Sequence, residues 1–327
     1  MNTNSIKLQA LLCGIIFLMS MSVASTVSGQ ARYFDERYIT TQGYVNPVLF
    51  NPGAIGQSGY HQILVNYRNK WASFDDSPKS FIGSYDGSLG NNIGIGAMIV
   101  SDNNAALETL KGQLGVNYTI KSAANKIGVG LTTEFIGHNI DAGVINDPTV
   151  DGTDILILDR LDGRNFFDIS LGAHGVYDEK FIYGVTLPGL LSMMLGDAES
   201  TVENELGLLL HLGYRFNVES YDIVAEPSII VKSLRYVPLH VDINMLGRFL
   251  DEKLSGGVTY TVGADERLGF LIGARVNAFN FFYSYNISRH EFQTYNNGSH
   301  ELSVRFDLGR KDKVMTTEMK GDKMMDK

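Results

Sequence analysis

Carboxylate side chains gather in one stretch of the chain, where they could bind a cation. Positions 138–165 contain the aspartates Asp141, Asp147, Asp151, Asp154, Asp159 and Asp162. Oxygen ligands of this kind suit Ca²⁺, but a calcium loop places them at alternating positions, and the run from Asp147 to Asp154 lacks that spacing. The pattern therefore favours a solvated acidic loop over a calcium site.

The 7 histidines are scattered, and no HxxxH or HExxH pair places two metal ligands on one helical face. A hydrolase would need a nucleophile, a histidine and a carboxylate that converge in space. His174 and His211 are candidates for the histidine, but no spacing singles out a nucleophile beside them. Gly94-Ile95-Gly96 alternates along a predicted strand and is not a phosphate loop. We predict no catalytic residue, no metal site, no cofactor and no enzymatic activity.

Composition narrows the classes of protein to which these 327 residues could belong. Hydrophobic residues make up 44% of the chain and charged residues 19%, with 35 glycines and a net charge of −9. This apolar content excludes disorder, the single cysteine excludes a disulfide scaffold, and the acidic balance disfavours nucleic-acid binding. Only the N-terminus approaches the run of about 20 apolar residues that a membrane helix needs. A soluble β protein and a membrane β-barrel both remain possible.

The N-terminus has the pattern of a secretory signal peptide. Lys7 precedes an apolar segment from Leu8 to Val23, and small residues follow up to Val27-Ser28-Gly29. We expect residues 1–29 to be removed by cleavage before Gln30, although an N-terminal membrane anchor is the alternative. Cys13 lies within the apolar segment, so the mature chain should contain no cysteine. The protein is predicted to be exported.

Beyond Gly59, apolar residues recur at every second position, which is the signal of β-strands. From Lys126 to Phe135, apolar residues alternate with small and polar residues. The segments 205–217 and 268–277 show the same alternation. In those two segments Leu209 and Leu271 are the exceptions, because they stand in the polar row. Two rows of opposite character are typical of a strand that separates two different environments.

The pattern predicts fourteen strands. We expect them at 61–72, 80–89, 92–101, 107–121, 125–137, 166–178, 180–188, 203–217, 220–232, 236–247, 253–263, 267–278, 280–289 and 299–308. The count is even, and about 9–11 tilted residues cross a bilayer, as bacterial outer-membrane barrels require. The connections after even-numbered strands are all short, whereas 138–165, 189–202 and 290–298 follow odd-numbered strands. This alternation is typical of periplasmic turns and outer loops.

Charged residues stand in the polar row of their strands, where a barrel would point them into its lumen. They are Glu134, His174, Glu205, Arg215, Lys232, Asp242, Arg275, Glu301 and Arg305. Pro227 and Pro238 lie inside predicted strands and cannot donate a ladder hydrogen bond, so we expect a bulge or a local break at each. The sequence therefore predicts an all-β, up-and-down transmembrane barrel of antiparallel strands.

The regions around the barrel complete the predicted organisation. Residues 30–60 lack a clear period and contain Asn-Pro and Pro-Gly turn signals, so we expect a periplasmic or lumenal arm before the barrel at 61–308. Residues 309–327 are rich in Lys, Asp and Met and should form a mobile periplasmic tail. The apolar run 187–195 should be a strand end plus a loop folded over the barrel mouth; a partner-binding surface is the alternative.

The stretch from Tyr44 to Asp102 resembles the start of the PorP/SprF family of type IX secretion proteins. An Asn-Pro turn that ends in glycine is represented by Asn51, Pro52, Gly53 and Gly56, although Gly53 stands where the family usually has alanine. An Arg-x-x-Trp element follows as Arg68 and Trp71, and then come Pro78, Ser80-Phe81 and Gly94-Ile95-Gly96. The usual Phe-Ser-Gln-Tyr opening is replaced by residues 33–38. The order and spacing of these short motifs carry the resemblance.

The resemblance implies a non-enzymatic component of the bacterial outer membrane. Such proteins associate with the periplasmic ring of the secretion machinery and with secreted cargo proteins, some of them gliding adhesins. It also implies that Arg68 points into the lumen or contacts the arm, and that Trp71 lies at the membrane interface. The alternative function is a barrel transporter or porin for small solutes, which should have a wide lumen or an inserted plug.

Overall fold

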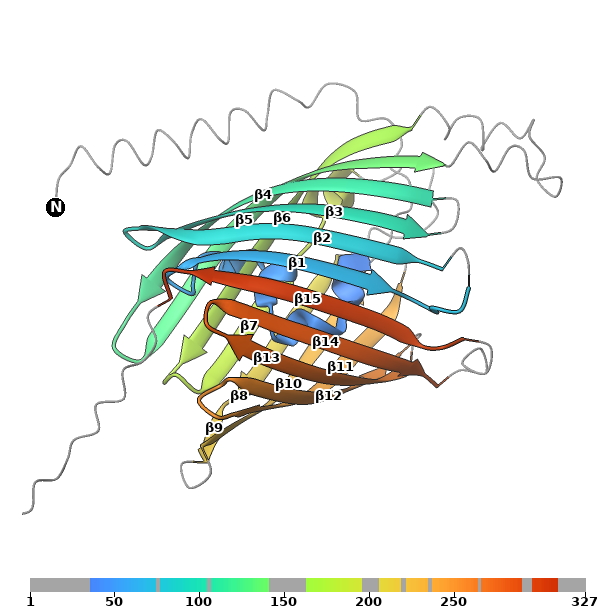
Figure 1. Cartoon of the computed structure of the whole chain (residues 1–327). Helices are drawn as coiled ribbons and strands as arrows, with labels where there is room; N and C mark the ends of the chain where they lie inside the picture. Colours follow the sequence, from blue (N-terminus) through green and yellow to red (C-terminus); the bar gives the residue numbers. More distant parts are fainter. Residues whose placement is uncertain are drawn as a thin grey trace, which may run out of the picture.

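The protein was analysed as a computed structural model, in which a single closed sheet surrounds a short N-terminal arm (Figure 1). The structure describes residues 36–74, 77–104, 107–140, 163–195, 206–218, 222–234, 237–263, 266–289 and 296–310. The predicted signal peptide, Glu205, the six loop aspartates and nearly all of the predicted tail lie outside these residues.

Fifteen strand segments occur in the described residues. They are β1 His61–Asn69, β2 Lys79–Gly90, β3 Ile93–Asn104, β4 Leu107–Lys121, β5 Asn125–Ile140, β6 Arg164–Tyr177, β7 Phe181–Leu187, β8 Leu208–Tyr214, β9 Phe216–Val218, β10 Ile223–Leu234, β11 Val237–Phe249, β12 Leu254–Val262, β13 Arg267–Val276, β14 Phe279–Ser288 and β15 Ser299–Leu308.

The segments β8 and β9 are one crossing, interrupted at Arg215, because both pair with β10 in a single continuous register. Each strand pairs antiparallel with its neighbours in sequence, β1 pairs with β15, and β10 pairs with β11, so the sheet closes. The prediction of a barrel of fourteen antiparallel strands is therefore confirmed. The predicted bounds of β4 and β15 agree with the structure, whereas the first predicted strand, 61–72, was too long.

Both internal prolines sit at irregularities, as expected from their missing N–H groups. The ladder between β8 and β10 stops at the pair Gly213–Ser228 and resumes at Phe216–Ala225, on either side of Pro227. Near Pro238, the register of β10 against β11 shifts between Lys232 and Leu234. The closed barrel thus accommodates one proline by a local break and the other by a bulge.

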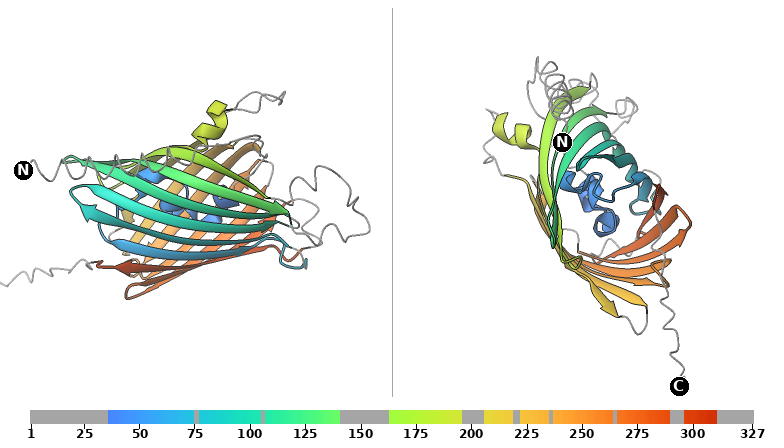
Figure 2. Two further views of the ribbon diagram at one scale, coloured as in Figure 1. Left: turned by 90° about the horizontal axis from the view of Figure 1, so that it is seen from above. Right: turned by 90° about the vertical axis from the view of Figure 1, so that its left-hand side faces the viewer.

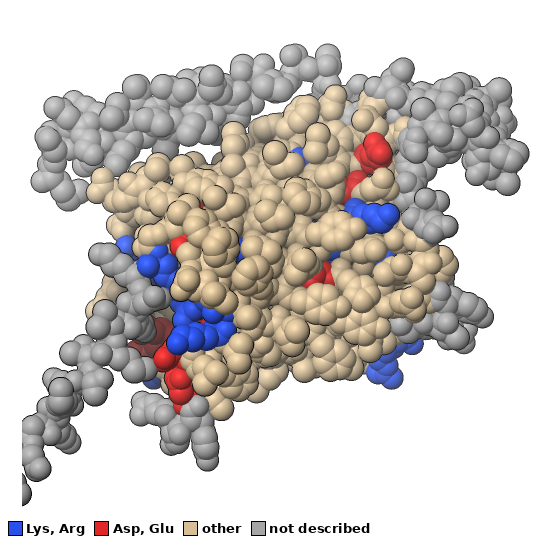
Figure 3. Space-filling view, viewed as in Figure 1, with Lys and Arg blue, Asp and Glu red and all other residues tan. Residues whose placement is uncertain are grey.

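The two faces of the wall differ as the alternation predicted. The outward row exposes large apolar side chains such as Ile99, Leu114 and Ile272, whereas Glu134, His174, Lys232, Asp242 and Glu301 are buried in the inward row. On the face in Figure 3, most charged residues lie toward the two ends of the barrel, and the zone between them is largely uncharged. None of the helices in the described residues is long and apolar enough to cross a membrane.

One end of the barrel has short turns, whereas the other joins its strands by both short and longer connections. Turns at 91–92, 122–124, 178–180, 250–253 and 277–278 mark one end, which also holds the start of β1 and the end of β15. The other end holds the strand ends that flank the longer connections: Asn69 and Lys79, Ile140 and Arg164, Leu187 and Leu208, and Ser288 and Ser299. By the rule for outer-membrane barrels, the first end is periplasmic and the second faces outward.

The helix α3, Leu190–Leu195, differs from the expectation for its apolar run. Asp168 of β6 accepts hydrogen bonds from the Leu191 amide (3.0 Å) and from the Ser192 amide (3.4 Å). In both views of Figure 2, α3 projects from the side of the barrel, so it does not fold over the mouth as we predicted. Met194 of this helix is 73% exposed.

The N-terminal arm lies inside the barrel (Figure 2). Its four 3₁₀ helices are η1 Glu36–Ile39, η2 Thr41–Tyr44, η3 Pro47–Leu49 and η4 Pro52–Ala54. Short 3₁₀ pieces are expected here because prolines and turn residues recur every few positions and prevent a longer helix. We refer to residues 36–57 as the plug.

Candidate functional site: a plugged lumen and a periplasmic vestibule

The outer half of the plug is held by a buried ion cluster. Arg37 lies 3.2 Å from Glu134 of β5, and Lys111 of β4 lies 2.8 Å from the same carboxylate. Ser170 of β6 donates a third bond to Glu134, at 3.0 Å, and Arg37 also bonds Gln113. All three charged side chains are at most 4% exposed. The plug is thus bound electrostatically to three adjacent strands.

A second carboxylate, Glu301 of β15, holds the start of η2 on the opposite wall. Glu301 accepts hydrogen bonds from the Thr41 amide (3.1 Å), from the Thr40 hydroxyl and from Asn66 (2.8 Å). Gln42 is fully buried and donates to the Ser284 hydroxyl at 3.0 Å and to the Glu301 carbonyl at 3.1 Å. The bond from the Thr41 amide satisfies a helix-end donor that would otherwise lack a partner inside the barrel.

Aromatic side chains of the plug rest on an apolar patch of the wall. Tyr38, Tyr44 and Phe50 form one buried cluster with inward side chains of β8, β10, β11, β13 and β14. That cluster includes Leu209 and Leu271, the two residues that broke the alternation of rows in the sequence. Burial raises the pKa of the Tyr44 phenol well above its usual range, so Tyr44 stays neutral. The two exceptions to the pattern are therefore contact sites of the plug.

The Asn-Pro-Gly turn joins the plug to β6 and β7. The Asn51 side chain accepts from the Gly53 amide at 2.8 Å, which caps η4, and donates to the Ala173 carbonyl at 3.0 Å and the Val185 carbonyl at 3.3 Å. Pro52 occupies the first position of η4, where no N–H is needed. Asn51 is fully buried, so a single side chain both shapes the turn and fixes it to the wall.

Glycines of the wall form a floor beneath this turn. A β-carbon at Gly94, Gly128 or Gly130 would overlap the carbonyl oxygens of Ile55, Gly53 and Pro52, respectively. The fit is reciprocal, since a β-carbon at Gly53 would lie 2.5 Å from the His174 amide nitrogen. This explains why glycine occupies position 53 here. The plug backbone lies directly on the wall backbone, without intervening side chains.

Gly56 ends the plug in a conformation that favours glycine. Its φ is +66°, and a β-carbon there would lie 2.6 Å from the Gly87 carbonyl oxygen. The Gly56 amide donates to the Asp86 carboxylate at 2.9 Å, and Asn117 donates to the Ile55 carbonyl at 2.8 Å. The four turn residues singled out by the family resemblance therefore all contact the barrel wall.

Arg68 and Trp71 lie together near the outer end, away from the Asn-Pro-Gly turn. Arg68 is one of three buried inward residues of β1 and is 5% exposed. Trp71 follows the end of β1 with a φ of +52°, and its amide lies 3.4 Å from the Ser299 hydroxyl. Both side chains border a small crevice beside Ile39 of the plug. Trp71 is therefore not part of a strand, contrary to the bounds that we predicted.

His174 and His211 face the lumen, with ring centroids 6.4 Å apart. His174 Nδ1 lies 3.1 Å from Gln57 Oε1; in the described residues, His174 Nε2 and both ring nitrogens of His211 have no hydrogen-bond partner. No hydroxyl nucleophile or carboxylate is therefore bonded to either ring there. The described residues also contain no group of three or more His, Cys, Asp or Glu that could hold a metal ion.

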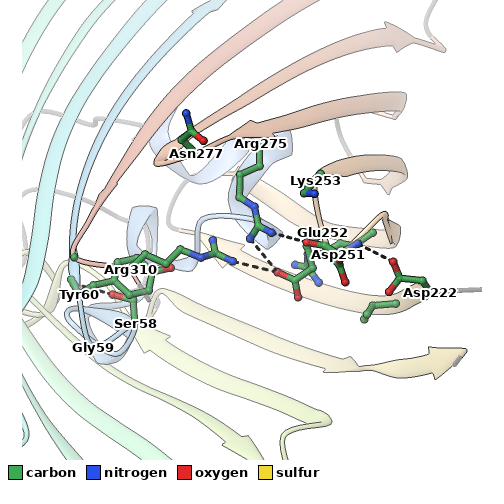
Figure 4. A pocket seen from close by; sticks show the side chains of 13 residues that line it. Ser58, Gly59, Tyr60, Asp222, Asp251, Glu252, Lys253, Arg275, Asn277 and Arg310 are labelled. Atoms are coloured by element: carbon green, nitrogen blue, oxygen red, sulfur yellow. Dashed lines mark hydrogen bonds and ion pairs between the residues drawn. The ribbon is translucent and has the colours of Figure 1, made fainter. Parts of the chain in front are cut away.

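Below the plug, a cavity of about 990 Å³ lies at the periplasmic end of the barrel (Figure 4). We call it the vestibule. Its lining combines the end of the arm, Ser58 to Tyr60, with wall residues Arg248, Glu252 and Arg275 and with Arg310 after β15. Burial raises the pKa of the Tyr60 phenol further above neutral pH, and the charged side chains of the lining are those of aspartate, glutamate, lysine and arginine.

Two carboxylates at the vestibule are each shared by two arginines. Glu226 lies 2.7 Å from Arg215 and 2.9 Å from Arg248, and it is 3% exposed. Glu252 lies 3.8 Å from Arg275 and 3.5 Å from Arg310 (Figure 4). Arg310 also lies 3.3 Å from Asp307, which in turn lies 3.0 Å from Arg305, so with these two residues counted each cluster carries one more positive than negative charge. Sequence reasoning missed this site, because its residues come from separate turns and strand ends.

Comparison with known proteins identifies the family. The family model of the type IX secretion system membrane protein PorP/SprF matches residues 35–306. A comparison with curated proteins returned no match.

Among solved structures, the Acinetobacter baumannii outer membrane protein Omp33 is similar at 8% identity and a TM-score of 0.46, covering 77% of this chain and 100% of that one. A deletion mutant of TodX, a monoaromatic hydrocarbon channel, is 10% identical with a TM-score of 0.49, covering 84% and 95%. A Pseudomonas aeruginosa FadL homologue is 11% identical with a TM-score of 0.45, covering 79% and 92%. With its closed transmembrane barrel, the chain is an outer-membrane protein, and it belongs to the PorP/SprF family of type IX secretion system membrane proteins.

Proposed function

We propose that this protein is a non-enzymatic accessory of type IX secretion that supports the secretion or surface attachment of specific cargo proteins, gliding adhesins among them. It would act by protein–protein contact, with outer connections facing cargo and the periplasmic end facing the ring of the secretion machinery. Family membership supports the secretion role. The observation that carries the contact mechanism is how the plug is attached: buried bonds from Arg37 to Gln57 fix it to the wall, and a plug that moved to let solute pass would have to break them.

Absence of enzymatic activity is part of this proposal. The two histidines considered as catalytic candidates, His174 and His211, contact each other, Gln57 and Phe50, and none of these is a nucleophile activated by a base. The family description names a membrane component of a secretion system and no reaction. These observations favour a structural and binding role.

A barrel transporter for small solutes is the second candidate. An inserted plug is also what a gated transporter would contain, so the plug keeps this function open. The two candidates differ in what the plug does. In a contact component it stays in place, whereas in a transporter it must move to let solute pass.

Deletion of the gene separates the two functions. We expect specific proteins to disappear from the medium and the cell surface, as measured by mass spectrometry of both fractions, and complementation with the intact gene should restore them. Complementation with Gly112→Ala serves as a matched control, because that glycine has no atom near its would-be β-carbon. An unchanged set of secreted and surface proteins, together with altered solute uptake, would overturn the proposal in favour of the transporter.

A further inference from the structure

We propose that the vestibule is a binding site for a carboxylate-bearing peptide segment of a periplasmic partner. The inference deepens the proposed function and rests on it for the side of the membrane from which the partner comes. The volume of about 990 Å³ is at the upper end of the range for ligand pockets, about 300–1,000 Å³, so a short peptide segment fits.

The charged side chains of the vestibule indicate what kind of ligand it would bind. The vestibule adjoins two clusters in which a pair of arginines shares one glutamate: Glu226 is 3% exposed behind the lining residue Arg248, and Glu252 is 49% exposed in the turn at the barrel end. A guanidinium that shares its carboxylate retains donors for a second anion, and guanidinium forks match carboxylate geometry. Arg248 and Arg275 are 18% and 14% exposed, so both are desolvated in part and still reachable from the cavity.

The rim is acidic on balance, which favours a peptide over a bare anion, because Asp222, Asp251 and Glu252 are exposed there beside the single lysine Lys253. Asp222 and Asp251 are exposed at the opening, and the Asp251 amide donates to the Asp222 carboxylate at 2.8 Å. Their carboxylates have no ion pair among the residues described here. An acidic group inside and a basic or amide-rich stretch at the opening would therefore complement the site along its depth, as a polypeptide can.

The vestibule also adjoins the end of the plug. Ser58 and Tyr60, directly after the plug, form part of its wall, and the Ser58 hydroxyl donates to the Tyr60 carbonyl at 3.0 Å. A bound segment would therefore contact the point where the plug joins β1.

The test uses the purified full-length protein in detergent and a fluorescent eight-residue probe peptide, rich in Glu and ending in a free carboxylate. A probe with Gln for every Glu and an amidated end is the neutral comparison. We expect saturable binding of the acidic probe, with affinity at least tenfold higher than that of the neutral probe. Arg248→Gln and Arg275→Gln, one in each cluster, should each weaken it about tenfold.

Arg289→Gln is the matched control, because Arg289 forms an exposed pair with Glu266, 3.0 Å away, at the outer end of the barrel. It should leave affinity unchanged, and heat-modifiable migration should show that all variants are folded barrels. Absent binding, equal binding of the neutral probe, or an equal loss in Arg289→Gln would overturn the inference. If the purified protein binds the peptide but deletion of the gene leaves the secreted proteins unchanged, the proposed function is refuted and the binding site is not. The failure of the inference and the failure of the proposed function can therefore be told apart.

Discussion

At the scale of single residues, contact between two backbones explains the turn that signalled the family. Pro52 and Gly53 lie on Gly128 and Gly130 of β5 so closely that no β-carbon fits between them. Asn51 supplies the hydrogen bonds that hold this turn against β6 and β7. The turn and the wall glycines therefore form one close contact that attaches the plug to the wall.

Substitution of a floor glycine should displace the plug. In Gly130→Ala the new methyl group would overlap the Pro52 carbonyl, and overpacking of this kind costs about 1–3 kcal/mol. We expect a lower urea midpoint and faster proteolysis of the plug. Gly112→Ala on β4, where the methyl group meets nothing, should behave as wild type. Equal midpoints for the two variants would contradict the close contact.

Neutralising Glu134 should destabilise the protein more than Gly130→Ala does. Glu134→Gln removes the carboxylate that Arg37 and Lys111 share, and breaking a buried ion pair costs about 3–5 kcal/mol. The free energy of unfolding measured in urea should fall accordingly. Glu266→Gln, in an exposed pair with Arg289, should change it by about 0–1 kcal/mol. A small effect of Glu134→Gln would mean that the cluster is solvated.

At the scale of elements, the plug and the wall are built by different rules. The wall strands alternate regularly and present mostly small or polar side chains inward, interrupted by two apolar patches beneath the plug, one on β8, β10, β11, β13 and β14 and one on β1, β2 and β3. The plug has no period because its short 3₁₀ pieces follow the available contacts rather than a repeat. The plug runs from the outer half of the barrel toward the periplasmic end. Arg37 contacts the outer half of β4 and β5, and Gln57 donates a hydrogen bond to the His174 carbonyl of β6 nearer the periplasmic end.

Removal of the plug should open a pore. Deletion of residues 36–57 leaves a barrel whose fourteen strands still pair around the full circle, and an inward row that is largely polar. We expect the deletion variant to keep heat-modifiable migration and to show stable ion conductance in planar bilayers, while the intact protein shows little. A folded but non-conducting deletion variant would show that the plug alone does not close the lumen.

At the scale of the whole molecule, the barrel separates an apolar outer surface from a polar interior filled by the plug. The exposed outward residues on β3, β4 and β13 are the large apolar side chains that lipid requires, and the charges lie inside or toward the ends. This arrangement accounts for the neutral mean hydropathy of −0.03, because two opposite rows average out.

The loss of stability caused by a charge on the lipid-facing surface should depend on the depth of that charge in the membrane. Leu114 lies in the middle of β4 and is 62% exposed, so Leu114→Arg should destabilise the barrel in lipid vesicles by about 2–4 kcal/mol. Glu108→Arg, near the outer end of the same strand, should cost about 0–1 kcal/mol. Urea unfolding in vesicles measures both values. Similar costs at the two positions would contradict the placement of this wall in the bilayer.

The sequence by itself determined the strands, their two faces and the barrel. These features follow from a period of two, which is a local property, and from the need to keep charges out of lipid. The bounds of β1 were too long because the positive φ of Trp71 ends the strand, and residue types at 70–72 do not reveal that conformation.

Only the tertiary structure decided where the arm lies and what holds it. Arg37 and Glu134 are 97 positions apart, and Gln42 and Glu301 are 259 apart, so no spacing along the chain links them. Leu209 and Leu271 were a visible signal, as exceptions to the polar row, but they did not name Tyr38, Tyr44 or Phe50 as their partners. Closure of the barrel brings these residues together, because pairing of β1 with β15 turns distant strands into one enclosing wall.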